Sequence, residues 1–565
     1  MIKETVMNRL IHMVLKKKGT RALDELDRNC ETAVDMSRDL LIKILQDNKD
    51  TEYGRRYGFA DITSVEEYRQ KVPFSVYDDY APYIERMIKN NETDLISVYP
   101  AVHYALSSGS VGVPKSIPVS EHTVECYGKY SANMVFGVMD RYCRKTFGRY
   151  SPKGRGINPV EVRSMQTENG VPKGTISARS LNTLKKFIPY IFSPPPEIMF
   201  TKEHMDLKYL HIRFALADRN LMFMMSAFMT ALADMMTYME TNWESLCREI
   251  EDGTLKEDAN IPDDVRKALQ AKIKPDPKRA AELRCEFAKG FDTPVVPRIW
   301  RNMTWIFAIG TGGFSGYTEK MRRYTGDMPI LFSVYAASEA LVAAAVNVNE
   351  EEFVLIPDSG FYEFVPMDSD DENTTYTIDQ LEPGRDYEII ITNLSGFYRY
   401  RIKDVVRITG FYKQSPKLKF VYRKNQMISI AGEKTNDEAV SWAVSEFAKE
   451  AGCGINDYSV EADTDSQPGR YIIYMEPDRI MPKEKTAEYT RLIEEKLSLA
   501  NPSFGDKVKN GVLGSTVLHF EQQETYALYR DMMIMRGISG NQLKPVRVID
   551  TPVKKKFFSA LIENR

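Results

Sequence analysis

Apolar positions in the first 95 residues recur every three or four residues. The positions that carry this spacing are Leu23, Leu26, Ala33, Met36, Leu40, Leu41 and Leu45. Residues at this spacing share one face of an α-helix. The spacing predicts a helical region over residues 1–95.

The pattern changes near residue 96 to short apolar runs that Gly, Pro and Ser interrupt. Residues 95–120 predict a strand, a glycine-rich turn and a second strand. Residues 202–290 are mostly helical in pattern. Within them, residues 221–233 form a 13-residue uncharged run. A membrane span needs about 20 residues, so we expect a buried helix here. Apolar runs alternate with Gly-rich turns over 297–338, which favours an α/β core.

Six closely spaced β-type runs follow between residues 352 and 422. They are the runs EFVLI, YEFV, DYEIIIT, FYRYRI, VVRIT and LKFVYR, and they predict a β-rich subdomain. Beyond Lys424 the pattern predicts a smaller α+β region. Its expected elements are helices at 438–450, 485–499 and 523–536 and strands at 458–462, 470–475 and 515–520. The fold expected is therefore α/β, with a large N-terminal domain over 1–424 and a small α+β domain over 425–565.

Composition and charge are those of an ordinary globular protein. The chain has 565 residues, of which 43% are hydrophobic and 27% charged, and its net charge is −3. This balance argues against a general nucleic-acid binder. No two of the six cysteines lie within five residues of each other, which argues against a zinc ribbon and a disulfide framework. The charged N-terminus lacks the apolar core of a signal peptide. We expect a cytoplasmic protein with no membrane or nucleic-acid partner.

A segment rich in hydroxyls and glycines lies between the first two predicted strands. It runs from Ser107 and Ser108 through Ser110 to Lys115. Backbone N–H groups, hydroxyls and a lysine can together bind phosphate oxygens. A Walker A loop needs Gly before the lysine, and Pro114 stands there instead. By itself the segment is also compatible with an ordinary Ser/Gly turn.

Two further segments combine an aromatic ring with a carboxylate. The first contains Tyr335, Ala336, Ser338 and Glu339, and the second runs from Tyr398 to Asp404. A Glu at a strand edge can hold a magnesium ion that bridges phosphates. A carboxylate such as Asp404 can accept hydrogen bonds from two ribose hydroxyls. Taken singly, each segment also fits a strand end with solvated charges.

Other residue types point to no separate chemistry. The six histidines show neither an HxH nor an HExxH spacing, and no G-x-S-x-G turn is present. Lys544 in the segment Asn541–Arg547 would, alone, be a solvated surface lysine.

The order of these segments resembles the adenylate-forming superfamily, and more closely the auxin-responsive acyl acid amido synthetases of the Gretchen Hagen family. Residues 107–115, 335–339 and 400–404 resemble that family's three ATP motifs in order. Further resemblances lie at 51–54, 72–73, 77–87, 361–366, 405–410, 434–438 and 541–544. The resemblance thus covers nearly the whole chain.

The resemblance implies an ATP-dependent ligase that first adenylates a carboxylic acid and then transfers the acyl group to an amino acid. Ser107, Ser108, Ser110 and Lys115 would contact phosphates, and Lys434 would approach them. Glu339 would hold magnesium, and Asp404 would bind ribose. Tyr335 with Ala336 and Ser338 would form the second ATP motif, and Tyr335 would flank adenine together with Gly312 and Gly313. A mobile small domain would deliver Lys544 to stabilise the adenylation transition state. Trp305 and Phe314 are candidates for the acyl pocket.

Three departures from the family pattern concern the ATP site. Val111 replaces a small or hydroxyl residue, Lys403 replaces a glycine, and residues 431–433 are less acidic than usual. A positive φ at Lys403 would strain the backbone. An acid–thiol ligase that uses coenzyme A or a carrier, and a non-catalytic acyl- or nucleotide-binding protein, are the alternatives. The particular acid, the acceptor and the oligomeric state stay open.

Overall fold

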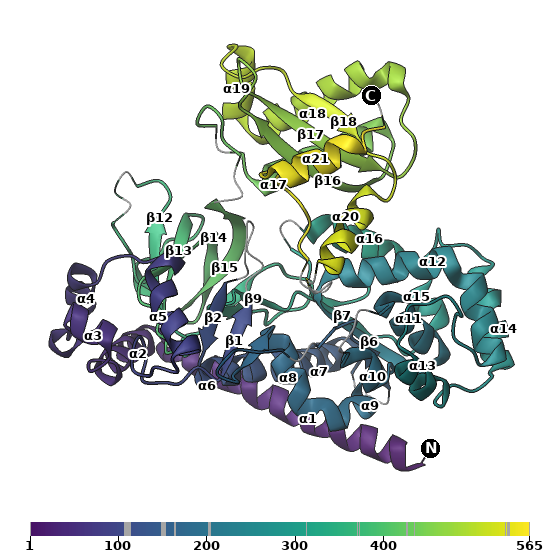
Figure 1. Cartoon of the computed structure of the whole chain (residues 1–565), viewed down its shortest axis with the longest axis horizontal. Coiled ribbons are helices and arrows are strands. Elements are labelled where there is room, and N and C mark those ends of the chain that lie inside the picture. The colour runs from purple at the N-terminus through teal and green to yellow at the C-terminus, as the bar shows by residue number, and fades with distance from the viewer. Residues whose placement is uncertain are drawn as a thin grey trace. The chain divides into compact units, whose positions relative to one another are not determined.

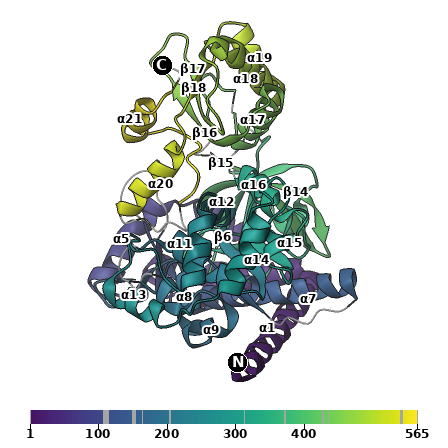
Figure 2. The same cartoon turned by 90° about the vertical axis from the view of Figure 1, so that its right-hand side faces the viewer.

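The computed structural model divides into two compact units. The first contains residues 1–310 and 317–420, and the second contains 311–316 and 421–565. The structure describes residues 2–106, 115–148, 154–162, 165–201, 205–311, 314–369, 371, 373–424, 428–433, 435–536, 538 and 543–563. Figures 1 and 2 show the chain in two perpendicular views.

Helices occupy most of the N-terminal region, as the apolar spacing predicts. Up to residue 325 the helices are α1 (Ile2–Asn29), α2 (Ala33–Asp47), α3 (Glu52–Tyr57), α4 (Val65–Lys71), α5 (Tyr77–Lys89), α6 (Glu121–Cys126), α7 (Met134–Phe147), α8 (Ile176–Leu184), α9 (Ile188–Ile191), α10 (Pro196–Met199), α11 (Leu207–Ala217), α12 (Met229–Asp252), α13 (Asp263–Gln270), α14 (Pro277–Phe287), α15 (Val296–Ile299) and α16 (Ser315–Thr325). A π-helical segment, Tyr127–Asn133, joins α6 to α7.

Helices α1 and α7 pack closely where two glycines face each other. A Cβ atom on Gly19 would lie 2.4 Å from the backbone nitrogen of Gly137, and a Cβ on Gly137 would lie 2.4 Å from the carbonyl oxygen of Gly19. Real Cβ contacts are never this short, so any larger residue at either position would force the helices apart.

The described residues of the first unit form three sheets. One has the order β2-β1-β5-β4, with strands β1 (His103–Leu106), β2 (Ser116–Val119), β4 (Met165–Gln166) and β5 (Pro172–Gly174). A second has the order β3-β6-β7-β8, with strands β3 (Arg155–Ile157), β6 (Leu221–Phe228), β7 (Trp305–Ile309) and β8 (Ile330–Leu331). Strands β1 and β2 confirm the two strands predicted on either side of the hydroxyl-rich segment, and they pair antiparallel.

The β3-β6-β7-β8 sheet is parallel throughout and corrects one prediction. The uncharged run at 221–233, expected to be one buried helix, is strand β6 up to Phe228 and helix α12 from Met229. A parallel strand covered on both faces is apolar at nearly every position, so its pattern does not distinguish it from a buried helix. Helix α12 packs against β6 and against α11 and α14 (Figure 1).

The third sheet has seven strands in the order β12-β13-β14-β15-β11-β10-β9. Its strands are β9 (Val334–Ala336), β10 (Leu341–Ala344), β11 (Phe353–Leu355), β12 (Phe361–Pro366), β13 (Asp386–Thr392), β14 (Tyr400–Tyr412) and β15 (Ser415–Arg423). The β-rich subdomain is therefore confirmed. The runs FYRYRI and VVRIT were expected as two strands. Residues 400–402 of the first and all of the second belong to the single strand β14, which an internal bulge interrupts.

The second unit is a three-stranded sheet with a hydrophobic core on each face. Its elements are α17 (Asp437–Ala451), β16 (Ile455–Asp463), β17 (Arg470–Pro477), α18 (Thr486–Ala500), α19 (Pro502–Lys509), β18 (Val517–Phe520), α20 (Thr525–Met535) and α21 (Pro552–Ala560). Successive side chains of β17 alternate between the cores, since Ile473 and Met475 join the core of α17 and α18, whereas Tyr474 joins that of α20 and α21. Figure 2 shows these helix groups on opposite sides of the sheet.

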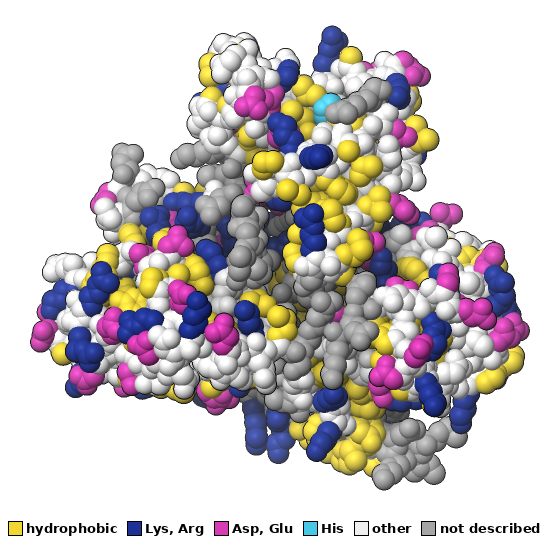
Figure 3. Space-filling view, in the orientation of Figure 1, with side chains coloured by type: hydrophobic (Ala, Val, Ile, Leu, Met, Phe, Trp, Pro, Cys, Tyr) yellow, Lys and Arg dark blue, Asp and Glu magenta, His cyan; other side chains and the backbone are white. Residues whose placement is uncertain are grey.

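The surface shows mixed charge. On the face in Figure 3, basic and acidic side chains of the first unit are interspersed, in keeping with the net charge of −3. Among the described residues, none of the helices combines the length and the apolar character that a bilayer span requires.

Candidate functional site

The second ATP-like segment forms the β9–β10 hairpin. The amide of Ala337 donates to the carbonyl of Ala340 at 2.9 Å, which closes the turn that contains Ser338 and Glu339. Tyr127 Oη donates to the carbonyl of Ala337 at 2.8 Å, and Asn393 Nδ2 donates to the carbonyl of Glu339 at 2.8 Å. Two groups from outside the hairpin therefore fix the main chain that carries the half-buried Glu339.

The third ATP-like segment lies in the bulge of β14. Arg401 pairs with Ile390 and Val405 pairs with Glu388. Three residues of β14 thus stand opposite one residue of β13. Lys403, inside the bulge, has a φ of +64°, the left-handed conformation that would explain a glycine in the family pattern. The bulge redirects the chain at Asp404, whose side chain is buried.

The structure brings these two segments together. Tyr335 Oη donates to Asp404 Oδ2 at 3.1 Å, and Tyr400 Oη donates to Glu339 Oε1 at 3.1 Å. Tyr335 is buried, and its ring lies 6.0 Å from that of Phe420. Two carboxylates and two tyrosines from distant parts of the sequence thus form one polar cluster at this sheet. Ala336 lies beside it on β9.

Lys115 immediately precedes strand β2 and lies beside Tyr77. Its side chain is exposed, and its ammonium group lies 4.7 Å from the centroid of the Tyr77 ring. The amide of Ser116 donates to Tyr77 Oη at 3.3 Å, which fixes that ring beside β2. Burial raises the pKa of Tyr77, the hydrogen bond with the Ser116 backbone opposes the rise, and the negative charges of Asp78 and Glu339 add to it. Tyr77, with Lys115 beside it, therefore lies within range of the electrostatic field of the Glu339 carboxylate.

Several predicted positions fall outside the described residues. They are Ser107, Ser108 and Ser110 of the hydroxyl-rich segment, Gly312 and Gly313, and Lys434. Their predicted roles in contacting phosphates and adenine stay predictions.

The two acyl-pocket candidates lie in different surroundings. Trp305 begins strand β7, is fully buried, and stacks on Phe223 with ring centroids 4.6 Å apart and planes at 5°. Phe136 meets the same ring edge-on at 6.0 Å. These contacts pack the Trp305 ring within the core, and its role in the acyl pocket stays a prediction. Phe314 is half-buried and belongs to the 311–316 segment of the second unit.

Lys544 is an exposed residue of the second unit. Three residues further on, the chain pairs with strand β16, because Val460 donates to the carbonyl of Arg547 at 2.9 Å and accepts from the amide of Ile549 at 2.9 Å. The Arg547 guanidinium donates to Asp457 at 2.5 Å and stacks 4.0 Å above the Tyr458 ring. This anchor fixes the chain immediately after Lys544 to the sheet.

The cluster includes four residues to which the sequence analysis gave no role. They are Tyr77, Tyr127, Asn393 and Tyr400. Tyr77 and Tyr400 belong to segments that carry the family resemblance, so the resemblance was an available signal for these two. Nothing in the local sequence distinguishes Tyr127 or Asn393.

The donor set at the cluster suits magnesium. Magnesium prefers hard oxygen ligands and is usually bound by one or two carboxylates together with substrate phosphates and water. The Glu339 carboxylate meets this requirement. Among the residues that the structure describes, no group of three or more His, Cys, Asp or Glu side chains forms an all-protein metal cage.

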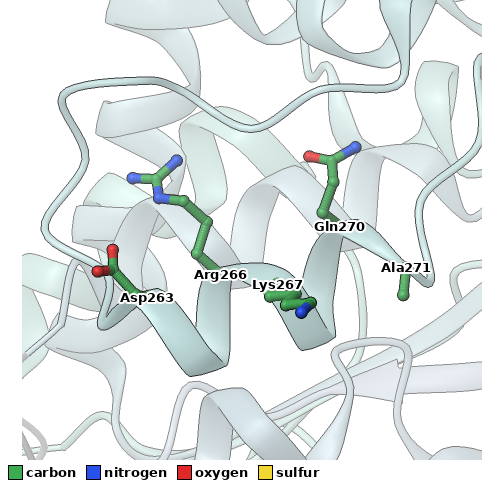
Figure 4. Close-up of a pocket in the computed structure, with 5 residues that line it drawn as sticks. All are labelled: Asp263, Arg266, Lys267, Gln270 and Ala271. Carbon is green, nitrogen blue, oxygen red and sulfur yellow. The ribbon is translucent and has the colours of Figure 1, made fainter.

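A surface pocket of about 420 Å³ lies elsewhere, on helix α13. Asp263, Arg266, Lys267, Gln270 and Ala271 line it (Figure 4). Arg266 donates to the carbonyl of Lys256 at 2.9 Å, and Gln270 donates to that of Gly253 at 2.6 Å. These polar groups hold the preceding loop, and none of the predicted site residues contributes to the pocket.

Comparison with known proteins identifies the class of this fold. A solved structure of the GH3.15 acyl acid amido synthetase superposes with a TM-score of 0.83, at 24% identity, covering 96% of this chain and 95% of that one. The fold is therefore that of an acyl acid amido synthetase.

Family matches extend along most of the sequence. Residues 22–330 match the GH3 family N-terminal domain, 353–423 the central domain and 438–553 the C-terminal domain. The chain belongs to the GH3 family, which confirms the resemblance. Indole-3-acetic acid-amido synthetase GH3.8 of Oryza sativa subsp. indica is 28% identical and covers 94% of this chain and 90% of its own. The 4-substituted benzoates-glutamate ligase GH3.12 of Arabidopsis thaliana is 28% identical, with coverages of 95% and 98%.

Proposed function

We propose that this protein is an ATP-dependent acyl acid amido synthetase. It is an amide-forming ligase whose substrates are a small carboxylic acid and an amino acid. The observation that carries the proposal is the meeting of the second and third ATP-like segments, through Tyr335 with Asp404 and Tyr400 with Glu339. The chain that holds them matches GH3 family domains over residues 22–330, 353–423 and 438–553.

The first half-reaction forms an acyl-adenylate. A carboxylate oxygen of the acid attacks the α-phosphorus of ATP, the bond between the α-phosphorus and the bridging oxygen breaks, and pyrophosphate leaves. The main requirement is neutralisation of charge on the phosphates. Lys115, with Ser107, Ser108, Ser110 and Lys434, supplies cationic and hydrogen-bonding groups. Glu339 holds magnesium, which neutralises phosphate charge when bound. Asp404 accepts from the ribose hydroxyls, and Tyr335 with Gly312 and Gly313 flanks the adenine.

The second half-reaction forms the amide. The amino group of the amino acid attacks the acyl carbon, the bond from that carbon to the phosphate oxygen breaks, AMP leaves, and the nitrogen loses a proton. Neither half-reaction needs a side-chain nucleophile.

The large and small domains that the sequence predicts have different roles in this proposal. Residues 1–424 bind ATP and the acid, and Phe314 is a candidate for the acid pocket. Residues 425–565 form a mobile lid that delivers Lys544 during adenylation. We place the reaction in the cytoplasm, since the spacing of the six cysteines suits a reducing compartment.

A screen for pyrophosphate release tests the function. Purified protein with MgATP is incubated with a panel of aromatic, indolic, jasmonate-like and fatty acids, with and without mixed amino acids. We expect acid-dependent release that amino acids increase, with an amide product identified by mass. Stimulation by coenzyme A instead of amino acids would identify an acid–thiol ligase, and ATP binding without release would identify a binding protein.

The lid role of Lys544 has its own test. We expect Lys544→Ala to slow adenylation about 100-fold or more, since loss of one transition-state charge contact has an effect of this size. Amide formation from preformed acyl-adenylate should change far less. Equal loss in both half-reactions would contradict the role, and Lys554→Ala, on α21, is the matched lysine control.

A further inference from the structure

The two carboxylates of the cluster are held in a reciprocal arrangement. Each motif contributes a tyrosine and, four residues later, a carboxylate: Tyr335 with Glu339, and Tyr400 with Asp404. Each tyrosine hydroxyl donates to the carboxylate of the other motif, and both distances are 3.1 Å. The hairpin and the bulge are therefore braced against each other by two crossed hydrogen bonds.

Tyr400 acts on the carboxylate of Glu339 and not on its main chain. The main chain of the turn is held separately by Tyr127 and Asn393. The ring of Tyr400 is packed in place, 4.7 Å from Phe397 and 6.0 Å from Tyr80 between ring centroids. A change to phenylalanine would thus remove one hydroxyl and leave the ring and the turn supported.

Tyr335 has the equivalent relation to Asp404. Its strand, β9, is fixed by pairing with β10, and its ring lies beside Phe420. Asp404 is in turn held on β14 by the pairing of the next residue, Val405, with Glu388. The hydroxyl of Tyr335 therefore contributes mainly to the direction of the Asp404 carboxylate.

We propose that Tyr400 and Tyr335 are positioning residues with separate effects, an inference that rests on the proposed function. Tyr400 orients Glu339 and thereby sets the affinity for the divalent cation. Tyr335 orients Asp404 and thereby sets the affinity for the nucleoside. Groups that orient a metal ligand typically change metal affinity by 10- to 100-fold when removed. The lower end of this range applies here, because the ring and the backbone stay in place.

Two binding measurements on the full-length protein separate these effects. The first is titration of Mn²⁺ in the presence of a non-hydrolysable ATP analogue, followed by electron paramagnetic resonance. The second is calorimetric titration of AMP without metal. We expect Tyr400→Phe to weaken Mn²⁺ binding about 10-fold and to change AMP binding less than 2-fold. Tyr335→Phe should weaken AMP binding about 10-fold.

The matched control is Tyr362→Phe in the same sheet. Tyr362 Oη contacts the Ser359 hydroxyl at 2.7 Å and the Leu341 carbonyl at 3.3 Å, so it should affect neither measurement. Rescue provides a further readout: excess Mg²⁺ should restore pyrophosphate release to Tyr400→Phe but not to Tyr335→Phe.

The possible outcomes test the positioning roles of Tyr400 and Tyr335 separately from the proposed function. Wild-type protein that binds neither AMP nor the Mn²⁺–nucleotide pair would overturn the proposed function. Wild-type protein that binds both, with variants that weaken both ligands equally or neither, would overturn the reciprocal positioning alone.

Discussion

Two sheets of the first unit are stabilised by opposite kinds of interaction. In the parallel sheet, β6 and β7 are joined by the stacked rings of Phe223 and Trp305, and burial of apolar surface dominates. In the seven-stranded sheet, Glu363 of β12 is buried against Arg399, which donates to it from Nε at 3.0 Å and Nη2 at 3.2 Å. Arg399 and Lys403 both have positive φ. The seven-stranded sheet, which carries the site, therefore contains or adjoins buried charge and strained backbone. The strands of the parallel sheet, as far as the structure describes them, contain neither.

The largest expected effect tests the apolar sheet. Trp305→Ala should lower the free energy of unfolding by about 4 kcal/mol, because it removes a fully buried ring and leaves a cavity. Urea unfolding followed by circular dichroism measures this. Trp442→Ala is the control, since that side chain is 44% exposed and should change stability by less than about 1 kcal/mol.

A substitution of Trp305 also tests whether the parallel sheet takes part in selecting the acid substrate. The milder Trp305→Phe should leave the relative kcat/KM values across the acid panel unchanged. A shifted acid preference with little loss of stability would show that Trp305 is a pocket wall, as the sequence analysis expected.

The second effect tests the buried charge of the seven-stranded sheet. Glu363→Gln should lower the free energy of unfolding by about 3 kcal/mol, because it leaves the buried Arg399 without its counter-charge. Asp368→Asn breaks an exposed pair with Arg385 and should lose only about 0–1 kcal/mol. If both substitutions have the same small effect in urea unfolding, the buried pair does not distinguish this sheet.

The two sheets also differ in how far their sequences predict them. Five strands of the seven-stranded sheet, β11 to β15, follow from the six predicted runs, because β-branched and aromatic residues alternate there with turn signals. Strands β9 and β10 are not among those runs. Strand β6 was not predicted, because an apolar run that is buried on both faces shows no alternation of apolar and polar positions. The bulge in β14 depends on its pairing with β13, which is a tertiary property and is absent from the local pattern.

The residues of the candidate site also differ in how far the sequence predicts them. Glu339 and Asp404 could be found from their motifs, because their roles depend on residue type and order. Their tyrosine partners depend on which strands meet across the sheet, and Tyr127 lies more than 200 residues before the Ala337 carbonyl that it contacts. Aromatic residues suit both pockets and cores, so residue type alone does not decide whether the buried Trp305 lines the acyl pocket.

The third effect concerns ligand binding at the site sheet. Asp404→Asn should weaken AMP binding by about 2 kcal/mol, roughly 30-fold, because hydrogen bonds to a charged acceptor are stronger than those to a neutral one. Calorimetric titration with AMP measures this. Asp386→Asn, on the neighbouring strand and paired with Arg407 at 2.7 Å, is the matched control and should leave AMP binding unchanged. If both substitutions weaken AMP binding equally, the effect comes from the loss of negative charge in general and not from a lost contact with ribose.

The smallest effect concerns the strained backbone beside Asp404. Lys403 has a φ of +64°, which costs a residue with a Cβ about 1–2 kcal/mol. Glycine avoids this cost but loses about 0.5–1 kcal/mol in chain entropy, so Lys403→Gly should stabilise the unit by about 0.5–1 kcal/mol. Lys403→Ala keeps the Cβ and removes the rest of the side chain, so it should leave the free energy of unfolding nearly unchanged. Stabilisation by glycine alone, with AMP affinity retained, would show that the site needs the left-handed backbone conformation at residue 403 and not the lysine ammonium. Loss of AMP affinity in both variants would show instead that the ammonium group itself contributes to the nucleotide site.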